Sequence, residues 1–477
     1  MSIETSQYSY LNTQYYMNKR LVILGAGESG TGTALLAKAQ GFDVFVSDMG
    51  AISDKYKNIL TENAIDFEEG KHTEEVILTA EEVVKSPGIP DKAPIIQLLK
   101  KNKIKVISEI EFAGRYTNAK KVCITGTNGK TTTTLLTHHI LLKAGFNAKL
   151  AGNIGESFAK QVLEESLEVS GQSLENTSNL IYVLELSSFQ LDGMFKFKAD
   201  IGILTNITPD HLDRYDYKIE KYVQSKFRIT QNMDSECTFI YGIDSELIEN
   251  ELFEFETDAE ELPFSVYPDE FDGACGDEEG ITIQIDSVEY YIDLSKSVLK
   301  GQHNLYNIMA ASLAAIKLGV STETIENALA DFQNADHRMQ LVAEIKGVKY
   351  INDSKATNVD SAWYALDAYK EPIVWIAGGV DKGNDYTALY EVVKDKVKAL
   401  VCMTKDAEKL QIAFKGKIPV IKISEDVQET VRICAELAEA GDVVLLSPCC
   451  ASFDLFKNYE DRGRKFAEAV KDLQYRG

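Results

Sequence analysis

The sequence lacks any apolar run near the roughly 18 residues that span a bilayer. Residues 1–19 are polar and tyrosine-rich, without the basic start and apolar core of a secretory signal, so we expect a flexible extension there. The seven cysteines are scattered, apart from adjacent Cys449 and Cys450, and form no CxxC or Cys/His ligand spacing. These absences exclude a disulfide framework and a zinc site, and they predict reduced thiols in a cytoplasmic protein.

Positive charge is also scarce. Fifty Lys and Arg stand against 74 Asp and Glu, which gives a net charge of −24. Such a surface repels nucleic acids and anionic membranes, so neither is an expected partner. The hydrophobic content of 44% is ordinary for a soluble globular protein, and a chain of 477 residues predicts roughly two to four domains.

The most informative stretch is a glycine-rich loop between an apolar run, 122–125, and a helical pattern that starts near Lys130. The loop reads Gly126-Thr127-Asn128-Gly129-Lys130-Thr131, and Thr132 follows it. Glycines let backbone N–H groups turn toward a phosphate, the lysine reaches the outer phosphates, and the next hydroxyl can hold Mg²⁺. Ile124 stands where the usual P-loop pattern has its first glycine. The alternative is an ordinary strand–turn–helix connection.

Strands and helices alternate along the chain, which predicts an α/β protein with mostly parallel sheets. We expect a Rossmann-like domain over 20–117, a central P-loop ATPase-type domain over 118–334 and a C-terminal Rossmann-like domain over 335–477. The first opens with Gly25-Ala-Gly-Glu-Ser-Gly30, and Asp48 ends its second strand. This is a dinucleotide-type fingerprint, although a tight turn without a ligand would look the same.

One acidic segment interrupts this alternation. Residues 244–279 show few periodic signals, so we expect a variable surface excursion there, followed by short antiparallel strands at 281–285 and 290–294.

Several polar side chains follow predicted strands, at the edge where such sheets bind ligands. Glu185 ends an apolar strand and is a candidate Mg²⁺ ligand, the alternative being a capping or surface acid. His211 follows the strand 201–204 and could ligate a metal or position a phosphate, or be satisfied within its loop. Lys226, judged from its local sequence alone, looks like a surface lysine.

The third domain contributes its own polar groups near its start. Asp353 follows a predicted strand and could bind ribose hydroxyls, while Arg338 and Lys355 could offset phosphate charge.

Taken together and in order, these motifs resemble the Mur ligases of peptidoglycan synthesis. The resemblance covers about residues 20–475 and rests on 126–131, Glu185 within 184–188, 206–211, 301–304, 337–338 and 352–358. Residues 25–30, 86–89, 353–358 and 446–454 look most like the branch of that family that adds D-glutamate to UDP-N-acetylmuramoyl-L-alanine. The Asp-Asn-Pro-Arg/Lys motif expected of relatives that add diaminopimelate or lysine is absent.

The resemblance implies an ATP-dependent amide ligase that works through an acyl phosphate, with small-molecule substrates, and we expect a monomer. It implies two Mg²⁺ sites, one at Thr131 and Glu185, the other at His211 and a carbamylated Lys226. The implied catalytic residues are Lys130, His211, Lys226 and Lys355.

The resemblance also implies three groups of binding residues. Those for ATP are Gly126, Thr127, Asn128, Gly129, Lys130, Thr131, Thr132, Asn304, Arg338 and Asp353. Those for the UDP-linked substrate are Glu28, Ser29, Ser86, Asn153 and Ser187. Those for D-glutamate are Lys355, Thr357, Lys382, Ser452 and Tyr459.

Two positions depart from the family pattern. The family often has a hydrophobic residue where Glu28 stands, and Met49-Gly50 replaces a Thr-Arg pair of some members. Contacts to the uridine diphosphate are therefore least certain at these two places.

Three other functions remain open from the sequence. One is a related ligase, either a folylpolyglutamate synthase or the L-alanine-adding Mur ligase. The second is a nucleotide-binding oxidoreductase built on residues 25–48, although such an enzyme needs no ATP cradle. The third is a nucleotide-binding protein without catalysis.

Overall fold

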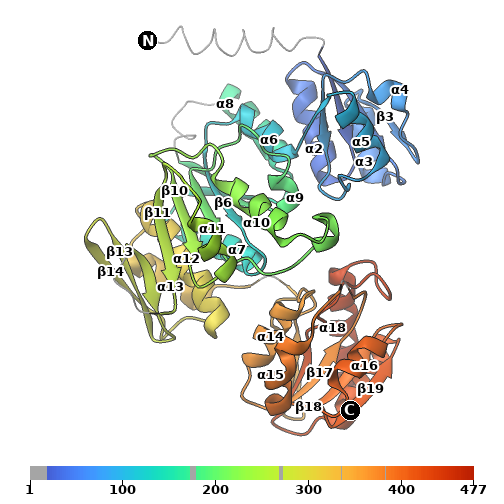
Figure 1. Ribbon diagram of the computed structural model, residues 1–477, viewed down its shortest axis with the longest axis vertical. Coiled ribbons are helices and arrows are strands. Elements are labelled where there is room, and N and C mark those ends of the chain that lie inside the picture. The colour runs from blue at the N-terminus through green and yellow to red at the C-terminus, as the bar shows by residue number, and fades with distance from the viewer. Residues whose placement is uncertain (1–18, 172–178, 268–271, 335, 382, 477) are drawn as a thin grey trace. The chain divides into compact units, whose positions relative to one another are not determined.

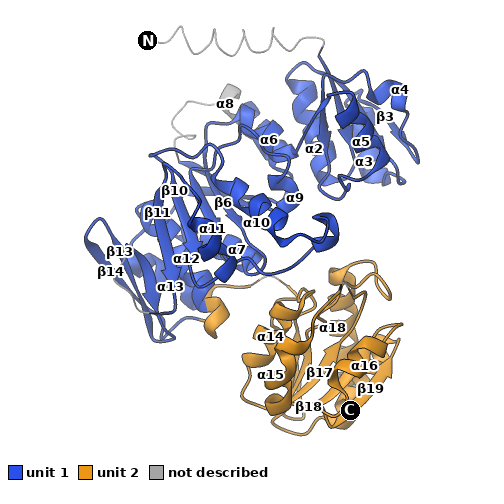
Figure 2. Cartoon of the chain, viewed as in Figure 1, with its two compact units in different colours: residues 1–297, 305–330 blue, residues 298–304, 331–477 orange. Residues whose placement is uncertain are grey.

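The computed structural model describes residues 19–171, 179–267, 272–334, 336–381 and 383–476. Apart from Lys19, the predicted extension over 1–19 lies outside the described residues. Contacts divide the chain into two compact units, one of residues 1–297 with 305–330 and one of 298–304 with 331–477 (Figure 2). The predicted domain boundaries at 117/118 and 334/335 stay predictions. Within the described ranges, no helix is long and apolar enough to cross a membrane.

The first sheet is wholly parallel, in the order β3-β2-β1-β4-β5 (Figure 1). Its strands are β1 (Arg20–Leu24), β2 (Asp43–Asp48), β3 (Asp66–Glu69), β4 (Glu82–Lys85) and β5 (Lys105–Ile107). Its helices are α2 (Glu28–Ala39), α3 (Asp54–Glu62), α4 (Glu74–Ile77), α5 (Pro94–Lys101) and α6 (Glu109–Ala113).

Apolar side chains on alternate positions of these strands bury both faces of the first sheet. On β1, Leu21 and Ile23 pack in the same core as Leu36 of α2. Val22 and Leu24 point to the opposite core, which holds Leu99 of α5. The strand order places a change of direction between β1 and β4, and such a point is where open α/β sheets bind ligands.

The second sheet has nine strands in the order β14-β13-β12-β11-β10-β9-β6-β8-β7. These are β6 (Lys120–Thr125), β7 (Asn147–Gly152), β8 (Leu180–Glu185), β9 (Ile201–Leu204), β10 (Thr238–Gly242), β11 (Glu260–Ser265), β12 (Gly273–Gly276), β13 (Gly280–Ile285) and β14 (Val288–Asp293). The helices are α7 (Lys130–Lys143), α8 (Phe158–Gly171), α9 (Ser188–Leu191), α10 (Ile219–Phe227), α11 (Glu246–Leu252), α12 (Gln302–Lys317) and α13 (Thr322–Asp331).

The acidic segment 244–279 is more regular than the sequence predicts. It contains α11, and β11 within it pairs in parallel with β10, so the segment extends the sheet. Leu262 and Phe264 of β11 are buried, while the acidic residues lie at its start. The sequence of this strand therefore does not alternate between apolar and polar residues. The antiparallel pair β13–β14 confirms the two predicted strands that follow.

The third sheet has the order β15-β16-β20-β17-β18-β19, with only the edge strand β15 antiparallel. Its strands are β15 (Gln340–Ile345), β16 (Val348–Asn352), β17 (Ile373–Ala377), β18 (Val397–Met403), β19 (Val420–Ser424) and β20 (Val443–Leu446). Its helices are α14 (Val359–Asp367), α15 (Tyr390–Lys396), α16 (Glu408–Phe414), α17 (Val427–Leu437) and α18 (Tyr459–Arg476). Separate cores on its two faces confirm the predicted doubly wound arrangement.

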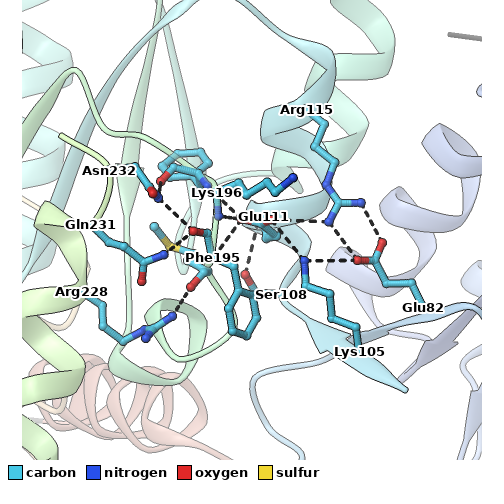
Figure 3. Close-up of polar contacts among 12 residues, drawn as sticks. Glu82, Lys105, Ser108, Glu111, Arg115, Phe195, Lys196, Arg228, Gln231 and Asn232 are labelled. Carbon is cyan, nitrogen blue, oxygen red and sulfur yellow. Dashed lines mark hydrogen bonds and ion pairs between the residues drawn. The ribbon is translucent and has the colours of Figure 1, made fainter. Parts of the chain in front are cut away.

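A buried carboxylate, Glu111 of α6, fastens the end of the first sheet's segment to the loop after α9 (Figure 3). One of its oxygens accepts hydrogen bonds from the backbone N–H groups of residues 195, 196 and 197 at 2.9–3.0 Å. The other lies 3.4 Å from Arg115 and 3.9 Å from Lys105. Burial raises the pKa of Glu111, but these donors outweigh it and hold the pKa below its usual value.

We predict that Glu111→Ala lowers the free energy of unfolding by about 3–5 kcal/mol, because three backbone donors and a guanidinium lose a buried charged partner. Urea denaturation measures the change. The matched control is Glu81→Ala, which removes an exposed ion pair with Lys19 and should cost less than about 1 kcal/mol. Equal small losses in both variants would contradict the role of Glu111.

Candidate active site

The predicted strand–loop–helix is present, and two glycines of its loop have no room for a side chain. The φ angles of Gly126 and Gly129 are +145° and +81°. A Cβ on Gly126 would lie 1.9 Å from Thr205 Oγ1, and one on Gly129 would lie 2.4 Å from Asn307 Oδ1. The loop therefore has a left-handed backbone packed directly against its neighbours, which only glycine permits.

Two lysines converge on one carbonyl of this loop. Lys130 Nζ donates to Gly126 O at 2.8 Å and to Thr127 O at 2.7 Å. Lys226 Nζ, from α10, donates to the same Gly126 O at 2.7 Å and to Thr125 Oγ1 at 3.2 Å. Lys226 is only 1% exposed, so it is not the surface lysine that its local sequence indicates.

Burial sets the chemistry of Lys226. Desolvation, followed by the charge of Lys130, lowers the pKa of Lys226 well below its ordinary value, although Asp210 and Glu185 oppose the shift. A lower pKa favours the neutral amine over the ammonium ion, and the neutral amine is a nucleophile.

The predicted position of Glu185 is confirmed, because it lies at the end of β8 beside the P-loop strand. Its register partner on β6 is Ile124, and the residue is 1% exposed, which rules out the surface alternative. Asn153 Nδ2 donates to Glu185 Oε1 at 2.7 Å, and the Asn153 backbone N–H donates to Glu185 O. Asn153, predicted to contact the UDP-linked substrate, here orients the carboxylate.

The loop after β9 is tied to the P-loop. Thr205 Oγ1 donates to Asn128 O at 2.6 Å, and the Asn128 backbone N–H donates to Asn206 Oδ1 at 2.9 Å. His211 has a φ of +53°, and its Nε2 lies 3.7 Å from Asp210 Oδ2. Sequence reasoning did not single out Asp210, whose charge acts on Lys226; its position in the polar cluster after β9 was the available signal.

These residues fit a magnesium ion. Among the described residues no three His, Cys, Asp or Glu side chains gather as a metal-binding group. Mg²⁺ does not need such a group, because it usually keeps several waters and binds one or two carboxylates plus substrate phosphates. The buried Glu185 carboxylate and the Thr131 hydroxyl, at the head of α7, are hard oxygen donors of that kind.

A second candidate site lies at the carboxyl edge of the first sheet. A cavity of about 570 Å³ is lined by residues that follow four of its strands. These are Gly25, Asp48, Met49, His72, Glu74, Ser86, Gly88, Ile89, Pro90, Ala93, Pro94 and Ile95. The predicted Ser86 is among them, whereas sequence reasoning missed His72, which stands alone in a polar loop.

The other residues predicted for the UDP-linked substrate have local partners. The Glu28 carboxylate accepts hydrogen bonds from Tyr56 Oη at 2.9 Å and Lys55 Nζ at 3.3 Å. The carbonyl of Ser29 accepts from Thr33 Oγ1, and Ser187 caps α9 through Gln190.

In the other unit, Asp353 is buried after β16. Burial raises the pKa of Asp353 to about 7, against the charge of Arg338 and hydrogen bonds from Met339 N and Ser447 Oγ. Asn304 Nδ2 donates to Lys300 O at 2.9 Å.

The residues predicted to bind D-glutamate differ in their burial and in their contacts. Lys355 Nζ lies 5.5 Å from the centre of the Tyr459 ring, Thr357 is half-buried, and Ser452 is 2% exposed. Lys382 lies outside the described residues. Sequence reasoning missed Arg462, which is buried and donates to the carbonyls of Ser354 and Cys450, holding two of these loops.

Three models of known protein families match segments of this chain. Residues 19–108 match the model of the Mur ligase MurD-like N-terminal domain, 124–315 the Mur ligase middle domain, and 337–450 the Mur ligase glutamate ligase domain. The chain belongs to the Mur ligase family.

Similar proteins cover almost the whole of this Mur ligase. The UDP-N-acetylmuramoylalanine–D-glutamate ligase of Bacteroides fragilis is 51% identical over 95% of this chain and 100% of its own. The enzyme of that name from Christiangramia forsetii is 49% identical over 96% of this chain and 100% of its own.

Solved structures support the fold. A pseudomurein peptide ligase type C from Methanothermus fervidus matches with a TM-score of 0.59 and 19% identity over 96% of this chain and 100% of its own. UDP-N-acetylmuramate-alanine ligase from Thermotoga maritima matches with a TM-score of 0.57 and 18% identity, over 95% of this chain and 99% of its own. Family membership and the P-loop geometry together set aside the oxidoreductase alternative.

We predict that Gly126→Ala weakens binding of an ATP analogue at least tenfold, because the new Cβ forces Thr205 away from the loop. Titration calorimetry measures the affinity. The control is Gly145→Ala at the other end of α7, where φ is +84° but no atom lies within 4 Å of the added Cβ. That variant should lose roughly 1–2 kcal/mol of stability and keep its affinity. Unchanged affinity in Gly126→Ala would contradict the loop's assignment.

Proposed function

We propose that this Mur ligase joins D-glutamate to UDP-N-acetylmuramoyl-L-alanine in an ATP-dependent step of peptidoglycan precursor synthesis, as a monomer in the cytoplasm. The observation that carries this proposal is identity near 50% over at least 95% of the chain to UDP-N-acetylmuramoylalanine–D-glutamate ligases. The buried P-loop edge supports it, because amide formation from a free carboxylate needs a phosphoryl donor.

The reaction has two steps. The alanine carboxylate attacks the γ-phosphorus of ATP, and ADP leaves with the electron pair of the broken P–O bond. The amine of D-glutamate then attacks the acyl carbon, inorganic phosphate leaves, and the nitrogen loses a proton to give the amide. Both steps need the negative charge of phosphate offset at a fixed place.

The P-loop provides that place. Lys130 would exchange its contacts with the loop carbonyls for the outer phosphates, and the loop N–H groups would hold the remaining phosphate oxygens. Thr131 and Glu185 would hold one Mg²⁺, with His211 and a modified Lys226 at a second. When bound, Mg²⁺ supplies charge that offsets the crowded phosphates. Asn304, Arg338 and Asp353 would contact the nucleotide.

Lys226 is proposed to be carbamylated. Its neutral nitrogen would attack the carbon of CO₂, form an N–C bond and release one proton. The resulting carbamate is an anionic oxygen ligand in place of a buried amine that burial disfavours as a cation. The nearby Lys130 would help to stabilise that negative charge.

The remaining contacts follow the two other sheets. Ser86 and its cavity would bind the uridine diphosphate portion of the acceptor, with Glu28 and Ser29 nearby on α2. Asn153 and Ser187 would face the muramoyl portion. The cations Lys355 and Lys382, with Thr357, Ser452 and Tyr459, would receive the carboxylates of D-glutamate.

We predict that phosphate release from ATP requires both UDP-N-acetylmuramoyl-L-alanine and D-glutamate. Tetrahydrofolate with L-glutamate, or UDP-N-acetylmuramate with L-alanine, should give no product. Lys130→Ala should lower kcat at least about 10²-fold while the protein stays folded. A phosphate-release assay with product detection by mass spectrometry decides between these ligases. Ligation of folate or of L-alanine instead would overturn the proposed substrates.

We predict that Lys226→Ala lowers kcat by at least about 10²-fold and that acetate or propionate partly restores it, because a carboxylate can replace the carbamate. Wild-type protein in ¹³C-bicarbonate should show a carbamate carbon resonance that the variant lacks. The control is Lys221→Ala, which changes an exposed lysine on the same helix and should alter neither kcat nor the carbamate resonance. A fully active Lys226→Ala, or a wild type without the resonance, would refute the modification.

A further inference from the structure

His72 lines the cavity at the carboxyl edge of the first sheet, on the loop between β3 and α4. The cavity volume, about 570 Å³, lies within the ~300–1,000 Å³ range of small-molecule sites. Much of its wall is apolar, including Met49, Ile89 and Pro90, and suits a flat ring. After Asp48, Met49 and Gly50 bring no polar side chain, so recognition of such a ring needs a polar group from elsewhere in the wall.

The protonation of His72 is fixed by a chain of hydrogen bonds that begins at Glu68. The Glu68 carboxylate accepts from the backbone N–H and the hydroxyl of Thr73, and it lies 2.8 Å from Ser47 Oγ. Burial raises the pKa of Glu68, but these hydrogen bonds outweigh it and hold the pKa below its usual value. Glu68 is therefore ionised and can only accept.

Ser47 must then donate its one proton to Glu68. The carbonyl oxygen of Lys71, 3.4 Å from Ser47 Oγ, can likewise only accept a hydrogen bond. Ser47 Oγ is left to accept from His72 Nδ1, which is 2.7 Å away. The proton of the neutral imidazole is consequently on Nδ1, and Nε2 carries a lone pair.

The outer edge of the ring is the one available to a ligand. Ser47 is fully buried and lies 2.7 Å from Nδ1, while in the described part of the chain Nε2 makes no hydrogen bond. Burial lowers the pKa of His72, although the charges of Glu68 and Asp48 oppose the shift, so the ring stays neutral at pH 7. The cavity wall thus presents a hydrogen-bond acceptor with a fixed direction.

Asp48 has a different task. Its two carboxylate oxygens accept the backbone N–H groups of Ala26 and Gly50 at 2.7 and 2.8 Å. The carboxylate therefore holds the turn after β1 and the turn after β2, and Asp48 is part of the wall of the same cavity.

We propose that His72 reads the base of the UDP-linked substrate, its Nε2 accepting a hydrogen bond from the N3–H of uracil, with Ser47 as the positioning residue that sets the tautomer. Cytosine has a lone pair at N3, so it would meet the lone pair of Nε2 and be rejected. The assignment rests on the proposed function, since it places the uridine portion of that substrate in this cavity.

Binding of three probes, UDP, CDP and N3-methyl-UDP, tests this assignment by calorimetry, independently of ligation. Wild type should bind UDP at least about tenfold more tightly than the other two. His72→Ala should bind UDP about tenfold more weakly and discriminate among the three by less than about twofold, because the acceptor is gone and the space admits a methyl group. His72→Gln, whose amide oxygen can accept, should recover part of the preference.

Two further variants distinguish recognition of the base by His72 from a purely structural role of this loop. Ser47→Ala should reduce the preference for UDP and shift the ¹⁵N resonances of His72 toward the Nε2–H tautomer. Glu75→Ala, an exposed neighbour on α4 that does not line the cavity, should bind all probes as wild type does.

Three results would overturn the assignment of His72. They are absence of UDP binding to wild type, an undiminished penalty for N3 methylation in His72→Ala, or a wild-type ¹⁵N spectrum with the proton on Nε2. The second would move the N3 contact to another group such as Asp48. If ligation of D-glutamate succeeds while any of these occurs, the proposed function stands and only the role of His72 fails.

Discussion

The parallel pairing of β6 with β8 on one side and β9 on the other is the constraint on which the candidate active site depends. Ile124 stands opposite Glu185, and Thr125 stands opposite Leu204. Because parallel strands end at the same edge, this register brings the P-loop, the buried carboxylate and the loop after β9 together. A shift of one residue would turn Glu185 to the other face of the sheet.

This register also places Lys226 in its unusual setting. The carbonyl of Gly126 accepts from both Lys226 and Lys130, and two cations on one carbonyl repel each other in a medium that screens little. This repulsion and the burial of Lys226 both lower the pKa of Lys226 and so favour its neutral form. Glycine at 126 permits the approach, since any side chain there would occupy the position of Thr205 Oγ1.

Much of the fold could be predicted because its strands are fully buried. Runs such as 443–446 and 180–185 are apolar on both faces, and their ends carry the polar residues that mark the site. The strands β11 and β12 were not predicted, because their sequences lack a clear apolar pattern. They are strands because they pair with neighbouring strands of the sheet. In such segments, tertiary contacts determine the secondary structure more than the intrinsic strand propensity of the residues does.

The site could be predicted less completely for a related reason. Glu185 follows a recognisable strand, whereas the burial of Lys226 depends on how α10 packs against a loop 100 residues earlier. Only the family resemblance pointed to Lys226. His72 and Arg462 gave no local signal, since a lone histidine in a polar loop and an arginine in a charged helix are usually solvated. Their roles come from Ser47 and from the carbonyls of Ser354 and Cys450.

In the proposed reaction, the acceptor's carboxylate takes a phosphoryl group from ATP at the P-loop edge before the amide forms. Oxygen-18 in that carboxylate tests the claim directly, because the acyl phosphate bridges through a carboxylate oxygen. With UDP-N-acetylmuramoyl-L-alanine labelled at both carboxylate oxygens, we predict that each turnover releases inorganic phosphate with one labelled oxygen. Unlabelled phosphate alongside full amide formation would contradict it.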